Sequence, residues 1–336
     1  MHLWRQKFPS GMPKQITSGT TQEQGIAVAP DGRSLITSIG RRLSAIWIHD
    51  PRGERPITSE GYASAARLSG DGTRAFFLDS VSPAFSTAGP APAGELRSVD
   101  IASGKTDSVL PGVSVTDYDI SPDGGAVAFS TRNRDGNSEL WIAPIDHRSP
   151  PRRIAGSADQ VSFSADQTVF FRATEGKLNF VDRTHTDGSG RKRVASTPIL
   201  IKYGVSPDGE WVAAAVPATG DGNRPSDNVG VPFATVAIAV HGDAVQRICA
   251  GTCSVRWSAD GRFFSVGVGG TWVIPVPAGK ALPLLPPAGI SEHDTPDTLP
   301  GARTISSAGV SIGSDPSTYV FRRTELHANL FRIPLH

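Results

Sequence analysis

The sequence predicts an all-β fold, a seven-bladed β-propeller of four-stranded antiparallel blades, closed by N- and C-terminal strands. Three observations support this prediction. A four-residue turn, Ser-Pro-Asp-Gly in its clearest copies, recurs along the chain. Apolar and polar residues alternate around each copy, which indicates strands with one buried face. The copies are 40 to 55 residues apart, which is the length of a propeller blade of four strands.

The aspartates of the recurring turn define the repeats. They are Asp31, Asp71, Asp123, Asp166, Asp208, Asp260 and Asp315. Asp-Gly favours a hairpin turn because the carboxylate accepts a backbone hydrogen bond and glycine readily adopts a positive φ. Gln167 and Pro316 replace the glycine in two copies. We therefore expect these two turns to differ from the others.

Four strands are expected in each repeat, and the first precedes the turn. The residue three before the aspartate is apolar in every copy, whereas the residue four before it is small or charged. The second strand follows the turn, as in 74–78. The third begins near an aliphatic–aromatic pair such as Leu140-Trp141, and the fourth is short, as in 152–154. No window shows helical periodicity, so we expect almost no helix.

The two ends of the chain do not match complete blades. Residues 1–11 are expected to be an N-terminal extension or a strand left over from a preceding blade, and residues 12–336 a single propeller. The carboxyl end stops on a third strand, 328–333, whereas 14–17 resembles a fourth strand without a blade. Pairing of these two segments would close the ring and remove exposed sheet edges.

The repeat resembles the TolB-type, WD-repeat-like propellers of bacteria. This resemblance rests on the SPDG turn, its following strand and the L-W-I strand, and it covers nearly the whole chain. The segments LWRQKFPSGMPKQITSG, GIAVAPDGRSLITS and VTDYDISPDG are also similar to propeller regions attached to bacterial serine/threonine kinases and winged-helix regulators. The resemblance implies a sensor or partner-binding module, with any catalysis on a separate upstream domain.

Composition narrows the classes of partner. The chain has 33 Lys and Arg against 32 Asp and Glu, a net charge of +1, so we expect no direct binding to nucleic acid. No apolar run approaches the roughly 20 residues of a membrane-spanning helix, and we expect no membrane segment in this chain. A monomer is expected. The sequence leaves the compartment open.

The motifs for chemistry are weak. Gly309–Gly313 (GVSIG) matches a nucleophile pattern, but Ser311 is followed by a strand rather than the helix that such a serine requires. Residues 133–139 lack the alternating acids of a calcium loop. We therefore expect no catalytic residue, metal or cofactor. Cys249 and Cys253 leave two alternatives open, free thiols or a short-loop disulfide.

The leading hypothesis is a non-enzymatic recognition or sensor propeller that binds a protein, peptide or small ligand, as the C-terminal part of a larger signalling protein. The alternative is a propeller hydrolase or the gating subunit of a peptidase. We expect a protein or peptide partner on the face that carries the long loops 80–94, 217–232 and 286–303, the last of which we expect to join two blades. The candidate ligand-binding residues, in those loops or facing the channel, are Arg67, Asp119, Arg256, Arg224, Asp227, His293 and Asp294.

Overall fold

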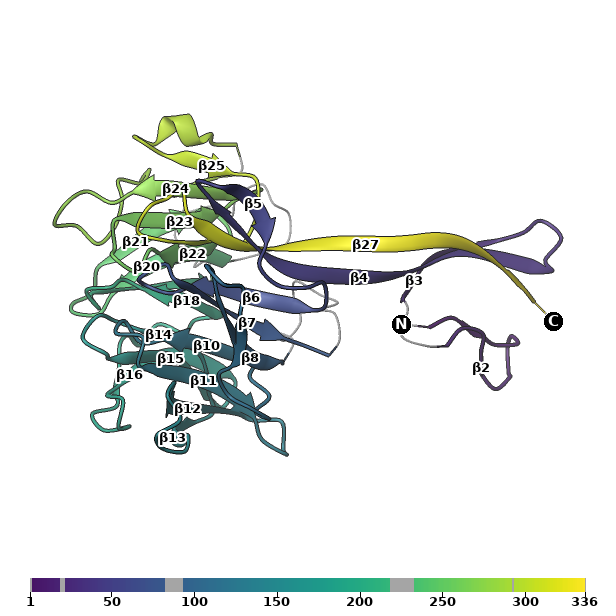
Figure 1. Cartoon of the computed structure of the whole chain (residues 1–336), viewed down its shortest axis with the longest axis horizontal. Coiled ribbons are helices and arrows are strands. Elements are labelled where there is room, and N and C mark those ends of the chain that lie inside the picture. Colours follow the sequence, from purple (N-terminus) through teal and green to yellow (C-terminus); the bar gives the residue numbers. More distant parts are fainter. Residues whose placement is uncertain (1, 19–21, 82–92, 218–232, 292, 336) are drawn as a thin grey trace.

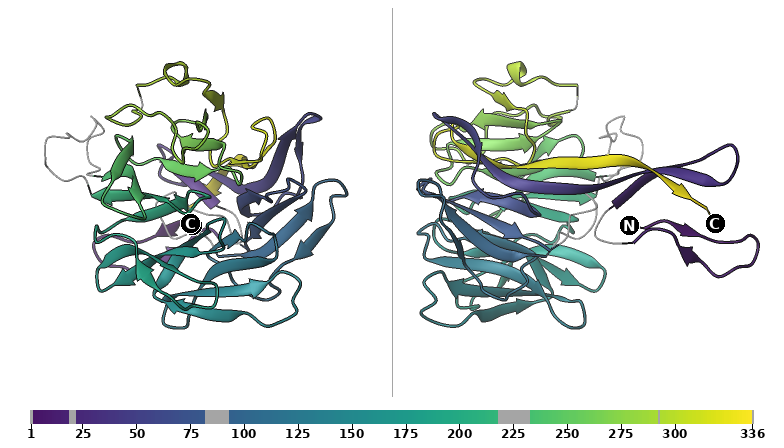
Figure 2. Two further views of the ribbon diagram at one scale, coloured as in Figure 1. Left: turned by 90° about the vertical axis from the view of Figure 1, so that its left-hand side faces the viewer. Right: turned by 45° about the vertical axis from the view of Figure 1, so that its right-hand side comes forward.

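The computed structural model describes the chain except residues 1, 19–21, 82–92, 218–232, 292 and 336. The described residues form 27 β-strands and one short 3-10 helix, η1 (Pro296–Thr298). Antiparallel sheets surround a common axis, and a long arm leaves one face of the ring (Figures 1 and 2). In this part of the chain, no helix has the length and apolar character needed to cross a membrane.

Five blades are built from consecutive strands, each ordered from the axis outward. The first contains β6 (Ala63–Leu68), β7 (Arg74–Asp79), β8 (Glu95–Asp100) and β9 (Thr106–Ser108). The second contains β10 (Asp117–Ile120), β11 (Ala126–Arg132), β12 (Ser138–Pro144) and β13 (Arg152–Gly156). The third contains β14 (Ala158–Phe163), β15 (Val169–Glu175), β16 (Leu178–Thr184) and β17 (Lys192–Arg193). The fourth contains β18 (Ile201–Val205), β19 (Trp211–Pro217), β20 (Phe233–Ala239) and β21 (Val245–Cys249). The fifth contains β22 (Ser254–Trp257), β23 (Phe263–Gly267), β24 (Thr271–Pro275) and β25 (Arg303–Ile305).

The sixth blade combines both ends of the chain. Its inner strands are β26 (Ser311–Ile312) and β27 (Tyr319–Pro334), and its outer strands are β4 (Ser34–Asp50) and β5 (Gly53–Pro56). The β27 and β4 strands pair from Tyr319 with His49 to Pro334 with Ser34. Only the first residues of β27 lie in the ring. The rest of this ladder, together with β3 (Gln22–Val28), forms the arm (Figure 1).

The all-β propeller of four-stranded antiparallel blades, closed by N- and C-terminal strands, is confirmed, but the number of blades needs correction. The described residues form seven sheets, of which six are blades and one is a separate two-stranded sheet. The Asp31 turn joins β3 to β4 at the end of the arm. Its repeat supplies only outer strands, β4 and β5, to the blade whose inner strands follow from the Asp315 repeat. Two partial repeats therefore make one blade.

The predicted closing pair is also wrong. Residues 328–333 pair with residues 35–40 of β4, in the arm. Lys14 and Gln15 form β2, which pairs with β1 (Trp4–Arg5) in the two-stranded sheet. The ring closes instead through Tyr319 to Arg323 of β27 and the end of β4. The spacing of the motifs could not distinguish residues 14–17 from β4 as the partner of residues 328–333, because residues 14–17 and 328–333 both have the pattern of outer strands.

The hydrophobic core consists of six clusters, one between each pair of neighbouring blades. One example joins Phe76 and Leu96 of the first blade to Tyr118 and Phe129 of the second. The clusters on either side of the sixth blade contain Ile46, Ile48 and Val320 on one side and Tyr319 and Phe321 on the other. Each blade buries apolar side chains against both neighbours, so every interface contributes to the stability of the ring.

The turns owe their shape to a shared hydrogen-bond pattern. In the turn at Asp123, the Ser121 hydroxyl donates to the carboxylate at 2.5 Å, and the backbone N–H of Gly125 donates to it at 3.0 Å. These bonds lower the pKa of Asp123. The expectation for Gln167 is wrong, because it adopts a left-handed φ of 63°, and its N–H donates to the Ser164 carbonyl at 2.9 Å as the N–H of Gly124 donates to the Ser121 carbonyl at 2.8 Å. Pro316 does alter its turn, since it has no N–H, and Thr318 donates to the Asp315 carbonyl instead.

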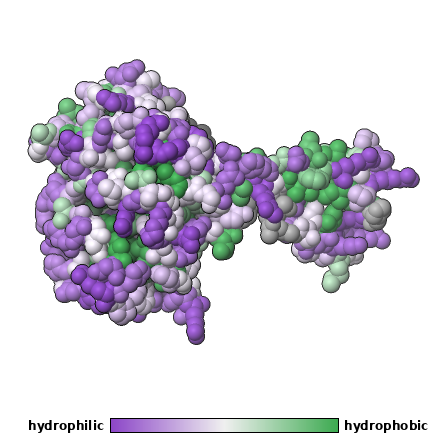
Figure 3. Space-filling model, viewed as in Figure 1, coloured by the Kyte–Doolittle hydropathy of each residue, from purple (hydrophilic) through white to green (hydrophobic). Residues whose placement is uncertain are grey.

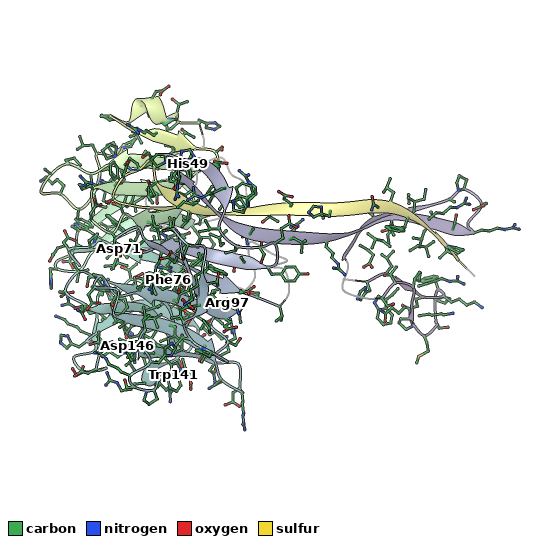
Figure 4. All side chains as sticks on the ribbon, in the orientation of Figure 1. His49, Asp71, Phe76, Arg97, Trp141 and Asp146 are labelled. Atoms are coloured by element: carbon green, nitrogen blue, oxygen red, sulfur yellow. A yellow bond between two sulfur atoms is a disulfide. The ribbon has the colours of Figure 1, made fainter. Side chains whose placement is uncertain are left out.

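The two faces of the ring differ. One face, here called the turn face, carries the turns that follow the first strands. Asp71 and Asp146 lie on this face, on the side of the ring opposite the arm (Figure 4). The arm and the connections between second and third strands leave the other, the arm face (Figure 1). The segment 286–303 does not join two blades as expected. It lies between β24 and β25 of the fifth blade, and Ile290 pairs with Cys249 at the outer edge of β21.

Cys249 and Cys253 form a disulfide, with their Cα atoms 6.3 Å apart. Both residues are buried in the cluster between the fourth and fifth blades. Of the two alternatives left open by the sequence, the structure has the disulfide. The bridge encloses a short connection between β21 and β22 and fixes it beside Thr235, whose hydroxyl accepts the N–H of Cys253 at 3.0 Å.

We predict that Ile46→Ala destabilises the ring by about 2–5 kcal/mol, because a buried Ile loses its packing and leaves a cavity. Ile46 lies on β4 in the sixth blade and is completely buried. Leu326→Ala is the matched control, since Leu326 lies on the arm part of β27 and is 50% exposed. It should change the free energy of unfolding by less than about 0.5 kcal/mol. Urea unfolding of both variants measures the difference, and equal effects would contradict closure through β4.

Candidate functional site

A polar cavity lies along the axis of the propeller. Its volume is about 680 Å³, and it is lined by residues from the first strands of all six blades and by the turns that follow them. Ser69 to Asp71, Ser121 to Gly124 and Ser258 to Asp260 surround its mouth. The cavity therefore opens on the turn face, away from the arm.

Two layers of side chains face the axis. The upper layer, nearer the turns, contains the residue four before each turn aspartate: Arg67, Asp119, Ser162, Gly204, Arg256 and Ser311. The lower layer contains the residue two positions earlier, because alternate residues of a strand share a face. In β6, β14 and β18 a register shift between these positions marks a bulge. Bulges re-aim side chains next to functional sites.

Asp117 and Asp119 bind Arg67 across the interface between two blades. The Arg67 guanidinium donates to Asp119 Oδ1 at 2.6 Å and to Asp117 Oδ1 at 3.4 Å. The other oxygen of each carboxylate accepts a backbone N–H of β14, from Val161 and Phe163, both at 2.9 Å. All four carboxylate oxygens thus have a partner. The three charged groups join the first, second and third blades.

Burial and charge shift the acid–base properties of this network. Burial raises the pKa of Asp117, against the opposing effect of the Arg67 charge. Burial disfavours the charged form of Arg67, but Asp119 and Asp117 outweigh this effect and raise its pKa. Burial also raises the pKa of Tyr118, whose hydroxyl donates to the Ala65 carbonyl at 2.6 Å. Arg67 lies over the ring of Tyr118, 5.1 Å from its centre.

Two further cations face the axis. The Lys202 ammonium is buried and donates to the Ser162 hydroxyl at 2.7 Å. Burial lowers the pKa of Lys202 to about 8. Arg256 has no side-chain hydrogen bond or ion pair to any residue that the structure describes, and the charge of Arg67, followed by burial, lowers its pKa to about 10. Of these two cations, Arg256 lines the cavity, whereas Lys202 is held by Ser162 and is not itself among the lining residues.

The sequence analysis predicted some of the residues of this site. Arg67, Asp119 and Arg256 lie together in the cavity, as their position before the turn indicated. Ser311 also lines the cavity, but its hydroxyl accepts the N–H of Leu68 at 3.1 Å, and β26 is followed by a strand rather than a helix. The sequence analysis missed Asp117 and Lys202. The same period of two, extended one step back from Asp119 and Gly204, would have found them.

The other predicted residues lie elsewhere. Arg224 and Asp227 fall outside the described residues. His293 is exposed, and Asp294 accepts hydrogen bonds from the backbone N–H and hydroxyl of Ser291, at 2.7 and 3.0 Å. These two lie in the segment between β24 and β25, away from the cavity lining. The structure therefore separates the loop residues from those near the axis.

One group of side chains has the composition of a metal site. Among the described residues, Glu60, Glu325 and His327 offer ligand atoms within 4.8 Å of one another, and all three are exposed. They lie where β27 leaves the ring, since Glu325 pairs with Leu43. By contrast, Asp117 and Asp119 near the axis are engaged by Arg67 and backbone N–H groups.

Comparison with known proteins shows the fold. No family model matches the sequence, and no curated protein matches it. A putative TolB from Agrobacterium tumefaciens superposes with a TM-score of 0.58 and 16% identity, over 85% of this chain and 99% of that chain. TolB from Acinetobacter baumannii gives a TM-score of 0.50 and 15% identity, over 70% of this chain and 61% of that chain.

A third structure, an oligogalacturonate lyase in complex with manganese, gives a TM-score of 0.50 and 12% identity, over 83% of this chain and 82% of that chain. These similarities confirm the TolB-like β-propeller fold. The sequence identities are too low to transfer a function from these proteins to this chain. The same fold serves binding proteins and enzymes. The function must therefore be argued from the cavity itself.

We predict that wild-type stability relative to Lys202→Met rises between pH 8 and pH 10.5. With the folded pKa at about 8, the unfolded chain binds more protons in this window, so deprotonation favours the folded state, by about 3 kcal/mol at its upper end. Below pH 8 the difference should be constant. Urea unfolding at several pH values measures it, with exposed Lys177→Met as the control. A flat difference through pH 10.5 would show that the ammonium is not buried.

Proposed function

We propose that this propeller is a non-enzymatic recognition module, a sensor that binds a peptide or small ligand in its axial cavity. The observation that carries the proposal is the cavity of about 680 Å³, lined by Arg256, whose guanidinium has no side-chain hydrogen bond or ion pair within the described residues. Ligand sites are typically concave, with a few convergent polar groups. Gly204 lacks a side chain and Ser311 has a short one, so the cavity is open beside Arg256.

The alternative, a propeller hydrolase or peptidase-gating subunit, has less support from the cavity. A hydrolase needs a carboxylate, histidine or other group free to take or give a proton. Each oxygen of Asp117 and Asp119 already accepts a hydrogen bond. No histidine is among the described residues that line the cavity. Recognition requires only the shape and charge that are present.

A protein or peptide partner on the arm face is the second part of the proposal. The described strands that flank 80–94 and 217–232, namely β7 and β8 and then β19 and β20, end and begin on this face, and the arm projects from it (Figure 1). Apolar residues gather on the outer part of the arm (Figure 3); Val28, Ile36, Leu330 and Phe331 are exposed there. A ligand on one face and a partner on the other would suit a sensor in a larger signalling protein, with a kinase or transcriptional regulator upstream.

We predict that Gly204→Phe blocks the cavity and abolishes ligand binding while the ring stays folded. A side chain fits at this position, because a Cβ atom would contact Trp257 at an ordinary 3.7 Å. Gly61→Phe is the control, since its Cβ would meet open space outside the cavity lining. Native mass spectrometry with a library of metabolites and short peptides measures retained ligands. Equal binding by both variants would exclude the cavity as the site.

We predict that replacing 80–94 and 217–232 by short turns leaves the ring folded and abolishes binding of a protein partner. Loops on a rigid scaffold are common binding elements. A matched replacement of 146–151, between β12 and β13 on the turn face, should retain the partner. Affinity capture followed by mass spectrometry compares the three proteins. Capture of the same partners by the loop-shortened protein would remove the arm face from the proposal.

A further inference from the structure

The axial cavity has an uneven distribution of charge. On one side, Arg67 forms ion pairs with both Asp117 and Asp119. On the other side lie Lys202 of β18 and Arg256 of β22, on adjacent blades. Within the described residues, Lys202 and Arg256 therefore have no aspartate in ion-pair contact, and the other acidic residues of the lining, Asp71, Asp123 and Asp260, belong to the turns at the mouth.

Arg256 is the cation with the fewest partners. Its guanidinium makes no hydrogen bond or ion pair within the described chain, although it lies inside the ring and lines the cavity. The upper-layer residues on either side of it are Gly204 and Ser311, so no large side chain stands between the guanidinium and the cavity. An arginine inside a protein is stabilised by a paired anion, because burial of an unpaired charge is costly.

Lys202 adds to the field around Arg256. Its ammonium has three donors, and the structure gives it one acceptor, the Ser162 hydroxyl. Ser162 itself lines the cavity. Burial disfavours the charged form of Lys202, the charges of Asp117 and Asp119 favour it, and the charges of Arg67 and Arg256 oppose it. An anion beside Arg256 would add to the effect of the aspartates and stabilise both cations. Neither aspartate can supply this anion, because all their oxygens are already engaged.

We propose that the cavity binds its ligand through a carboxylate group, held by the guanidinium of Arg256 in the field of Lys202. This inference rests on the proposed recognition function and names the chemistry of the ligand. The planar guanidinium matches a carboxylate through two parallel hydrogen bonds. The carboxylate belongs either to a small molecule or to the free C-terminus of a peptide.

The test uses the full chain and four probes at constant ionic strength. The probes are acetyl-trialanine with a free carboxylate, the same peptide with a C-terminal amide, sodium propionate and inorganic phosphate, with sodium chloride as the reference salt. Binding is measured by calorimetry and by the shift in melting temperature. Free acetyl-trialanine, propionate or both should bind. Binding of one alone identifies the source of the carboxylate, as a peptide C-terminus or a small molecule. The amide should bind at least about tenfold more weakly.

Arg256→Gln should weaken carboxylate binding by at least about tenfold and leave amide binding unchanged. Arg256→Lys keeps the charge without the two-pronged geometry and should be intermediate, which also covers the case in which the Gln variant fails to fold. Arg132→Gln removes an exposed arginine outside the cavity and serves as the control. Wild-type affinity in both Arg256 variants would overturn the proposal.

Other outcomes separate this inference from the proposed function. Equal binding of acid and amide, both lost in Gly204→Phe, would overturn the carboxylate inference and leave recognition in the cavity intact. A shift with phosphate or chloride as large as that with carboxylate would show a general anion effect and overturn it as well. Library ligands that persist in Gly204→Phe would overturn the proposed site itself.

Discussion

The pairing of β27 with β4 is the constraint on which the rest of the structure depends. A propeller blade buries its apolar faces against two neighbours, so the loss of one blade would expose two clusters of core residues. Here the sixth blade exists only because strands from opposite ends of the sequence pair. Ile46 and Ile48 of β4 and Val320 of β27 contribute to one interface, and Phe321 to the next. The same ladder then continues beyond the ring as the arm.

Closure also determines the geometry of the cavity. Six first strands meet at the axis, and each contributes one residue to the upper layer. The Leu68 N–H donates to Ser311, which connects the closing blade to the first blade beside Arg67. Arg67 in turn connects to the second blade through Asp119, whose other oxygen accepts an N–H of the third. Polar bonds around the axis thus run across the same interfaces that the apolar clusters fill further out.

The sequence was sufficient to predict the features that depend on neighbouring residues in the chain, namely the turns, the strands and the side chains that face the axis. The turns follow from Asp and Gly, and the strands follow from alternating apolar residues. The direction of Arg67, Asp119 and Arg256 toward the axis follows from their distance to the turn. Extending that alternation would have added Asp117 and Lys202. The bulge in β18, between Lys202 and Gly204, interrupts simple counting there and explains why the second layer is harder to recognise.

The features that depend on pairing between distant segments, namely the position of the Asp31 hairpin and that of residues 286–303, could not be predicted in the same way. The Asp31 motif encodes a hairpin turn, but nothing within it specifies whether the hairpin lies in a blade or in the arm. That choice is made by β27, nearly 300 residues away in the sequence (Phe331 pairs with Thr37). The segment 286–303 is a similar case. Ile290 and Leu299 pack into the cluster between the fourth and fifth blades, and this burial, rather than any local signal, keeps the segment at the rim.

The continuity of β4 has a mechanical consequence. One uninterrupted strand runs from the Asp31 turn at the end of the arm to Asp50 in the sixth blade, at about 3.3 Å per residue, or roughly 55 Å in total. Its backbone hydrogen bonds to β27 resist shear along the whole length. A load on the end of the arm is therefore delivered as torque to the one blade whose opening breaks the ring. A force on the arm would therefore act on the β4–β27 pairing that closes the propeller.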